Sequence, residues 1–385
     1  MAKLGKCSVF VVVAAVVLML VGPCSAAAGE EMQTFDRKFI SWDDARLDAY
    51  SHSFDFDNGT EQQQQQGEAR PSYGEEYYRG SRVIVVDQNG GGDSVTVQGA
   101  VDLVPEFNTQ RVKIHILPGI YREKVVVPVT KPYISLIGDE GNMSNTVITW
   151  HNRASDLDSK GMELGTFSTA SVSVYSDFFC ATGITFENTV VAVPGDYGNQ
   201  AVALRISGDK AFFYKVKIIG SQDTLLDDAG SHYYYQCHIL GSIDFIFGRG
   251  RTLFRDCVVE SRAKHGHGGA IAAHHRDAAE EDSGFSFVGC LIKGTGKILL
   301  GRAWGNYSRV IYSYCNIQDM ITPEGWGDFN QPSRRQTAVF GEYRCMGRGA
   351  DTSRRVPWSK TRLNFQQVKP FLDLRFIDGH QWLRL

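Results

Sequence analysis

The second part of the chain, from Arg82 onward, alternates short apolar runs with turn-forming residues. Four such runs predict strands, at residues 83–86, 112–117, 124–129 and 133–137. Residues 94–104 instead carry apolar side chains at helical spacing behind Ser94, which is a candidate cap, and predict a helix. Short strands separated by tight turns predict an all-β domain.

A degenerate repeat follows in five segments. Each has an aromatic residue, then a small apolar residue three positions later, then a β-branched residue two positions beyond. The small positions are spaced by 21, 20, 33 and 25 residues and are Val216, Cys237, Cys257, Cys290 and Cys315. A strand-like unit repeated in this way, with no helix of 10–15 residues between units, favours a single-stranded parallel β-helix. The cysteines are then expected to stack in the core rather than form disulfides.

The N-terminal residues resemble a secretory signal. Lys3 and Lys6 precede an apolar run at residues 8–21, and small residues follow, so we expect residues 1–26 to be cleaved. The alternative is an uncleaved membrane anchor, for which the run is short. We therefore expect a secreted protein without stable membrane insertion.

Residues 27–80 are acidic and contain a glutamine tract, which predicts a flexible extension. A few of its aromatic positions, in residues 39–42, could still pack on the domain formed by residues 81–385. The net charge of −3 offers no basic field for nucleic acid. Three sequons, at Asn58, Asn142 and Asn306, are typical of a secreted glycoprotein.

The sequence offers no metal site and no cofactor motif. The cysteines that follow the signal form no Cys-x-x-Cys pair. Histidines gather where the repeat spacing is longest, without acidic ligands at good spacing, and we expect a solvated loop there. These histidines are His265, His267, His274 and His275.

Carboxylates and amides recur at the solenoid spacing. Gln200 and Gln222 are 22 residues apart, and Asp223 and Asp244 are 21 residues apart. Because neighbouring parallel strands lie about 4.8 Å apart, we expect the two carboxylates to come into contact range. Such a pair splits into an acid and a base or nucleophile, and the two amides can donate to an oxyanion.

Two further residues complete this constellation. Arg302 can hold one aspartate ionised, and Trp304 beside it can stack on a sugar. Together these groups predict ester hydrolysis through a covalent carboxylate intermediate.

Five motifs resemble, in order, the signatures of the pectin methylesterase family. They are residues 119–123, 200–204, 222–225, 244–248 and 300–304. The resemblance runs from about Arg82 to the C-terminus and implies a right-handed parallel β-helix that removes methyl esters from galacturonate in pectin. It fits the short class, which lacks an N-terminal inhibitor-like domain.

The resemblance also implies roles for the site residues. Asp244 is the expected nucleophile, and Asp223 is the expected general acid and later base. Gln222 is expected to stabilise the oxyanion with help from Gln200, and Arg302 is expected to keep Asp244 charged.

Substrate contacts are expected from Thr166, Trp304 and Trp326. The chain departs from the usual family pattern at Leu226, where Tyr is common, and at Ala303, where Pro is common. Both departures bear on substrate preference rather than on the reaction.

The expected partner is methyl-esterified homogalacturonan in the cell wall, with proteinaceous pectinesterase inhibitors as further candidates and a monomer as the expected state. One alternative is a polygalacturonase on the same fold, since Asp227, Asp228 and His267 match part of that family's motifs. The other is a catalytically weak protein that only binds the wall. Methanol release separates the esterase from a binder, and new reducing ends reveal a polygalacturonase.

Overall fold

The structure is a computed structural model that describes residues 39–47, 81–193, 195–264 and 269–385. All of them belong to one compact unit, Arg37–Leu385. The predicted signal peptide and most of the predicted extension lie outside the described residues. None of the helices in the described ranges is long and apolar enough to cross a bilayer.

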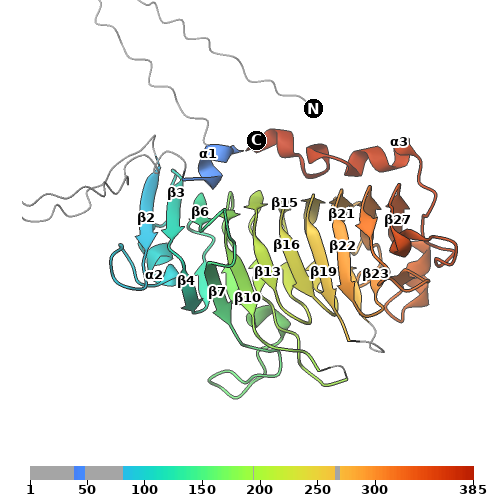
Figure 1. Cartoon of the computed structure of the whole chain (residues 1–385), viewed down its shortest axis with the longest axis horizontal. Coiled ribbons are helices and arrows are strands. Elements are labelled where there is room, and N and C mark those ends of the chain that lie inside the picture. The colour runs from blue at the N-terminus through green and yellow to red at the C-terminus, as the bar shows by residue number, and fades with distance from the viewer. Residues whose placement is uncertain (1–38, 48–80, 194, 265–268) are drawn as a thin grey trace, which may run out of the picture. The chain divides into compact units, whose positions relative to one another are not determined.

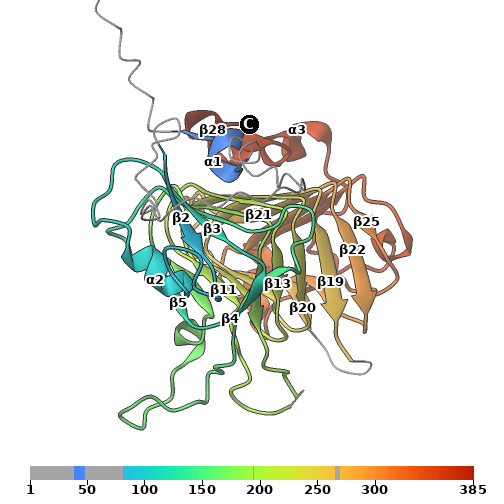
Figure 2. The ribbon, with the colours of Figure 1, turned by 60° about the vertical axis from the view of Figure 1, so that its left-hand side comes forward.

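The chain winds into a right-handed parallel β-helix with three long sheets (Figures 1 and 2). The first sheet has ten strands, in the order β2 (Arg82–Val86), β3 (Val112–Ile116), β6 (Ile134–Ile137), β9 (Cys180–Thr182), β12 (Ala211–Tyr214), β15 (Ser231–Tyr235), β18 (Arg251–Arg255), β21 (Gly284–Val288), β24 (Arg309–Ser313) and β27 (Val339–Tyr343). The prediction of an all-β solenoid is confirmed.

The other two long sheets have eight strands each. The second sheet consists of β4 (Gly119–Arg122), β7 (Thr146–Trp150), β10 (Thr185–Asn188), β13 (Lys217–Ile219), β16 (His238–Gly241), β19 (Val258–Arg262), β22 (Leu291–Thr295) and β25 (Asn316–Ile317). The third consists of β5 (Val125–Val127), β8 (Val172–Val174), β11 (Leu204–Ile206), β14 (Leu225–Asp227), β17 (Ile246–Gly248), β20 (Ala270–His274), β23 (Leu299–Arg302) and β26 (Trp326–Gly327). The strands predicted in residues 83–137 are present, and β4 is an additional one.

The positions aligned in the sequence repeat are the residues that pair with one another in the first sheet. Phe212 pairs with Tyr233, which in turn pairs with Leu253. A single residue with positive φ then turns the chain toward the second sheet, as at Gln236 (φ 54°) and Asp256 (φ 53°). The next residue, Cys237 or Cys257, is buried in the core.

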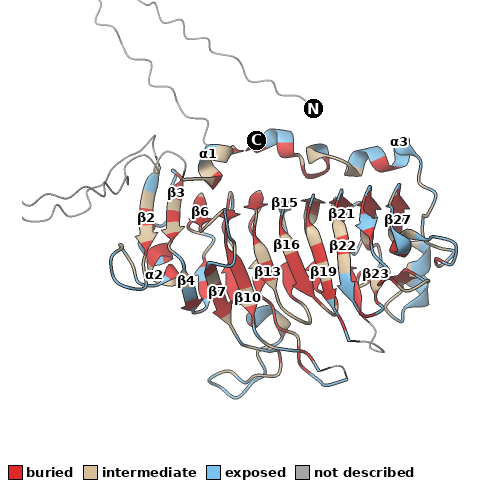
Figure 3. Cartoon of the chain, in the orientation of Figure 1, coloured by how far each residue is buried: buried red, intermediate tan, exposed pale blue. Residues whose placement is uncertain are grey.

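Much of the strand sequence is buried (Figure 3), and side chains of successive coils stack in the interior. One aromatic ladder has ring centroids 4.4–4.9 Å apart on successive coils and consists of Phe213, Tyr234, Phe254, Phe287 and Tyr312. The cysteine column lies beside it. All six cysteines of the described residues are free, and five of them are buried, so the prediction of core cysteines is confirmed.

Short helical segments cap the solenoid and cover one side. They are α1 (Trp42–Ala45), α2 (Val97–Asp102), α3 (Phe365–Val368) and the 3₁₀ turns η1 (Thr166–Ser168), η2 (Pro332–Gln336), η3 (Arg348–Ala350), η4 (Lys369–Phe371), η5 (Leu374–Ile377) and η6 (Gly379–Gln381). Helix α2 is shorter than predicted, because Thr96 rather than Ser94 caps it. The carboxylate of Glu123 accepts hydrogen bonds from two backbone N–H groups in the first turn of α2, at 2.8 and 2.9 Å.

Part of the predicted extension is docked on the solenoid. In a two-stranded sheet, β1 (Ile40–Ser41) pairs with β28 (Leu383–Arg384), and Ile40 is fully buried. Trp42 packs edge-on against Phe212 and Tyr214 of the first sheet. Figure 1 shows α1 and the C-terminal segment on the same side of the solenoid. Residues 39–47 are therefore docked on the solenoid, as the aromatic positions in residues 39–42 allowed.

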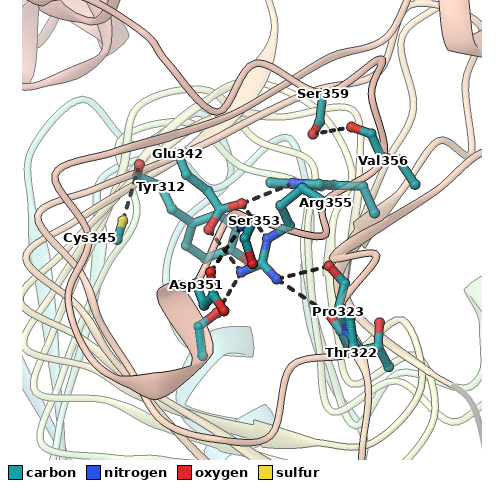
Figure 4. A network of polar contacts seen from close by, with 12 residues as sticks. Tyr312, Thr322, Pro323, Glu342, Cys345, Asp351, Ser353, Arg355, Val356 and Ser359 are labelled. Atoms are coloured by element: carbon teal, nitrogen blue, oxygen red, sulfur yellow. Dashed lines mark hydrogen bonds and ion pairs between the residues drawn. The ribbon is translucent and has the colours of Figure 1, made fainter.

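A buried ion pair closes the C-terminal end (Figure 4). Arg355 donates two hydrogen bonds to Glu342 of β27, at 2.8 and 3.1 Å, and both side chains are at most 3% exposed. Arg355 also donates to the carbonyls of Thr322 and Pro323, while the Trp326 indole N–H donates to Glu342. This network holds the segment that follows the last full coil.

Replacing Arg355 by Met is expected to reduce the free energy of unfolding by about 3–5 kcal/mol, because Glu342 is left as a buried charge without a partner. The matched control is Arg354→Met, which removes an exposed arginine next in sequence. Urea unfolding of the two variants measures the difference. Equal stabilities would show that the pair contributes nothing.

Candidate active site

The two candidate carboxylates lie at the corner between the second and third sheets. Asp223 stands between β13 and β14, and Asp244 stands between β16 and β17 on the next coil. Gln222 pairs with Ile243, and the N–H of Asp223 donates to the carbonyl of Ile243 at 3.0 Å. The predicted 21-residue register is therefore present, with Asp223 directly beside Asp244.

Both aspartates adopt the left-handed backbone conformation, with φ of 59° for Asp223 and 47° for Asp244. Few residues adopt this conformation readily, and aspartate is among them. The tight corner therefore suits aspartate.

Arg302 of β23 holds the Asp244 carboxylate. Its Nε donates to Oδ1 at 2.6 Å, and its second nitrogen, Nη2, donates to Oδ2. Asp244 is only 7% exposed. A bidentate guanidinium of this kind fixes the orientation of a carboxylate as well as its charge.

The surroundings separate the titrations of the two carboxyls. Removal from water, reinforced by the Asp244 carboxylate, raises the pKa of Asp223 well above its usual range. Burial also raises the pKa of Asp244, but the hydrogen bonds and charge of Arg302 act in the opposite direction. Asp223 is therefore the group suited to carry a proton, and Asp244 is the group suited to be ionised.

Two glutamine side chains lie on the same corner. The main-chain carbonyl of Gln222 accepts from the N–H of Ala201 at 3.1 Å, and that of Gln200 accepts from the N–H of Ala154 at 2.9 Å. Within the described part of the chain, neither side-chain amide makes a hydrogen bond, and both are half-buried. Both amides are thus free to donate to a substrate oxygen.

The floor beside the carboxylates is apolar. Leu226, Phe247 and Ala273 form a buried cluster on the third sheet, and Trp304 packs against it with its ring 5.9 Å from Phe247. Leu226, one of the departures from the family pattern, is fully buried here.

Thr166 begins η1, next to the coil that carries Gln200. The hydroxyl of Thr169 at the end of that turn accepts from the N–H of Val202 at 2.9 Å. Thr166 itself is half-buried. It therefore lies on the glutamine side of the corner.

Trp326 is not a cleft residue, and that prediction is wrong. It is 2% exposed and stacks on Phe340 at 4.6 Å. Its register partner is Gly301, where an added Cβ would come 3.1 Å from the indole ring. The glycine leaves the space that lets the indole fill the interior.

Phe329 is the aromatic residue that sequence reasoning missed. Its ring lies 4.4 Å from the guanidinium carbon of Arg302, a cation–π contact. The backbone of Phe329 is in the left-handed conformation, with φ of 58°, which is typical of a tight turn.

The residues that resembled a polygalacturonase have structural partners. Asp227 is buried and accepts from His232 and Thr252, at 3.0 and 2.6 Å. Asp228 accepts from Arg205 at 2.7 and 3.0 Å. Neither carboxylate is placed beside Asp223 in the manner of Asp244.

The predicted histidine loop is only partly a loop. His274 belongs to β20 and is fully buried, so the prediction is wrong for this residue, whereas His265 and His267 lie outside the described residues. His275 contacts Trp304 edge-on at 4.7 Å. Across the described ranges, no group of three His, Cys, Asp or Glu is arranged to hold a metal ion.

Known proteins are similar to this chain in sequence and in fold. A sequence profile of the Pectinesterase family matches residues 83–380. Pectinesterase QRT1 of Arabidopsis thaliana is 66% identical over 304 residues, which cover 79% of each chain. The structure of a pectin methylesterase from carrot has a TM-score of 0.72 at 32% identity, covering 78% of this chain and 94% of that one. A pectin methylesterase from Aspergillus niger has a TM-score of 0.67 at 27% identity, covering 78% and 96%. The chain belongs to the pectinesterase family.

Proposed function

We propose that the chain hydrolyses the methyl esters of galacturonate units in cell-wall pectin, with Asp244 as nucleophile and Asp223 as acid and base. Family membership supports the reaction. The observation that carries the residue roles is the in-register pair, in which only Asp244 has a bidentate arginine. One carboxyl is thereby suited to attack and the other to carry the proton.

In the first step, a carboxylate oxygen of Asp244 attacks the ester carbonyl. The amides of Gln222 and Gln200 donate to the oxyanion of the tetrahedral intermediate. The C–O bond to the methoxy group then breaks, Asp223 gives its proton to the leaving oxygen, and methanol departs. An anhydride between Asp244 and the galacturonate carboxyl remains.

In the second step, Asp223 is ionised and acts as base. It takes one proton from a water molecule that attacks the galacturonate carbonyl of the anhydride, and the C–O bond to Asp244 breaks. The product leaves as galacturonic acid, which carries the other water proton and releases it to the solvent, and Asp244 is left as a carboxylate. Asp223 is then protonated again and Asp244 ionised, as at the start. Thr166 and Trp304 are proposed to contact the sugar, and Phe329 to support Arg302.

The location of the enzyme, its oligomeric state and its partners are proposed from the sequence. Residues 1–26 direct secretion, and the mature protein acts in the cell wall as a monomer. Its substrate is methyl-esterified homogalacturonan, and proteinaceous pectinesterase inhibitors are candidate partners.

The experiment follows methanol and reducing ends in one digestion of highly methylated pectin. Methanol is expected to rise while the number of reducing ends stays constant, because the ester is cleaved and the glycosidic bonds are not. New reducing ends would favour a polygalacturonase. Binding to pectin without methanol release would favour a wall-binding protein.

The pH profile of kcat/KM is expected to be bell-shaped, because activity needs Asp244 ionised and Asp223 protonated. Arg302 acts to lower the pKa of Asp244. Arg302→Gln removes that effect, so the pKa rises further and the acidic limb moves to higher pH. Arg302→Lys keeps the charge and should move the limb less. An acidic limb that stays in place while activity drops would show that Arg302 acts on the substrate instead.

A further inference from the structure

A groove lies on the outer face of the second sheet, away from the apolar floor on the third. It has a volume of about 490 Å³ and crosses β4, β7, β10 and β13. The catalytic residues do not line it. Its lining residue Ile219 ends β13, four residues before Asp223 in the sequence.

Two cations line this groove without a partner. Arg122 of β4 and Lys217 of β13 make no ion pair and no side-chain hydrogen bond with any residue that the structure describes. Glu187 of β10 lies between them, yet within the same described residues its carboxylate accepts only from the hydroxyl of Thr149, at 2.9 Å. The charged groups of the groove therefore remain free to meet a ligand.

The groove also has an aromatic platform. Trp150 at the end of β7 is half-buried, and its indole N–H donates to Asn152 at 2.6 Å, which fixes the ring. The ring of His151 lies 4.7 Å away and extends the same surface. Apolar surface with a few convergent polar groups is the usual composition of a ligand site.

This combination selects a class of ligand. An aromatic platform suits the apolar face of a sugar ring, and the free oxygen of Glu187 can accept from a hydroxyl. A neutral sugar would leave Arg122 and Lys217 unused, whereas a chain of uronates can present a separate carboxylate to each. In a chain with a net charge of −3, these two cations give the groove a local charge opposite to that of a polyuronate.

We propose that this groove is a second carbohydrate site, which binds de-esterified stretches of galacturonan through Arg122, Lys217 and Trp150. The inference rests on the proposed function, because the reaction turns neutral esters into the carboxylates that the groove binds. A bound product stretch keeps the enzyme on the same polymer and raises the effective concentration of nearby esters.

Calorimetric titration with an unesterified galacturonate decamer tests the site. The wild type is expected to bind two decamers, one in the catalytic cleft and one in the groove. Arg122→Gln/Lys217→Gln is expected to bind one, and Trp150→Ala, which changes no charge, is expected to lose the same site. The control Arg354→Gln/Lys369→Gln removes two exposed cations elsewhere and should keep both sites.

Kinetics on two substrates complete the test. The groove variant is expected to show a KM raised at least about threefold on partly de-esterified pectin, with kcat unchanged on a short fully methylated oligomer. One site in the wild type, two in the groove variant, or an equal loss in the control would overturn the proposal. Failure of the proposed function would appear separately, as wild-type protein that releases no methanol.

Discussion

Asp244→Asn is expected to reduce methanol release at least about a thousandfold, because a neutral amide cannot form the anhydride intermediate. The substitution changes little else. Asparagine has nearly the same shape and tolerates the left-handed conformation of this residue, at φ 47°. The initial rate on methylated pectin measures the effect, and the melting temperature confirms that the fold is kept.

Asp256→Asn is the matched control. Asp256 has the same backbone conformation, at φ 53°, but lies at the corner between the first and second sheets, with half of its side chain exposed. Its substitution should leave the rate unchanged. A rate for Asp244→Asn of a tenth of the wild type would reject Asp244 as nucleophile.

Gln222→Ala is expected to lower kcat by about 10²–10³-fold with little change in KM. The amide makes no hydrogen bond within the described structure, so its removal breaks no internal contact. Its donor matters only when negative charge develops on the carbonyl oxygen, which is why kcat should fall rather than KM rise.

Gln200→Ala should have a smaller effect, because Gln200 only assists. Gln318→Ala, an exposed glutamine on a distant coil, should have none. A rise in KM with unchanged kcat for Gln222→Ala would make that residue a ground-state contact and not an oxyanion donor.

The repeat predicted the register because a parallel coil permits little choice. Side chains alternate between the faces, so a slip of one residue would turn Cys237 and its neighbours outward. The same constraint places Asp223 beside Asp244, and this part of the site follows from the sequence alone. Arg302 could be associated with the pair, but its bidentate geometry could not be read from spacing.

The two errors about aromatic residues near the site have a common cause, which is the direction of a side chain outside the repeat. Trp326 belongs to a strand of two residues, too short for alternation to show a face, and the space left by Gly301 draws it inward. Phe329 reaches Arg302 through a left-handed turn that no periodicity predicts.

The docking of residues 39–47 leaves a signal in the sequence of the first sheet. Strand β12 is apolar at every position, as expected of a parallel strand covered on both faces. Phe212 and Tyr214 on its outer face therefore need a cover, which Trp42 and the C-terminal segment provide. Continuous apolar strands together with an aromatic-bearing extension thus predict this contact.

A partition experiment shows whether the reaction passes through a covalent intermediate on Asp244. The enzyme hydrolyses methyl and ethyl esters of polygalacturonate with a fixed concentration of hydroxylamine present, and the ratio of hydroxamate to free acid is measured. An anhydride on Asp244 is released to water or hydroxylamine only after the alcohol has left, so the same ratio is expected for both esters. A ratio that depends on the alcohol would contradict such an intermediate, because the added nucleophile would then be competing with water for the ester itself.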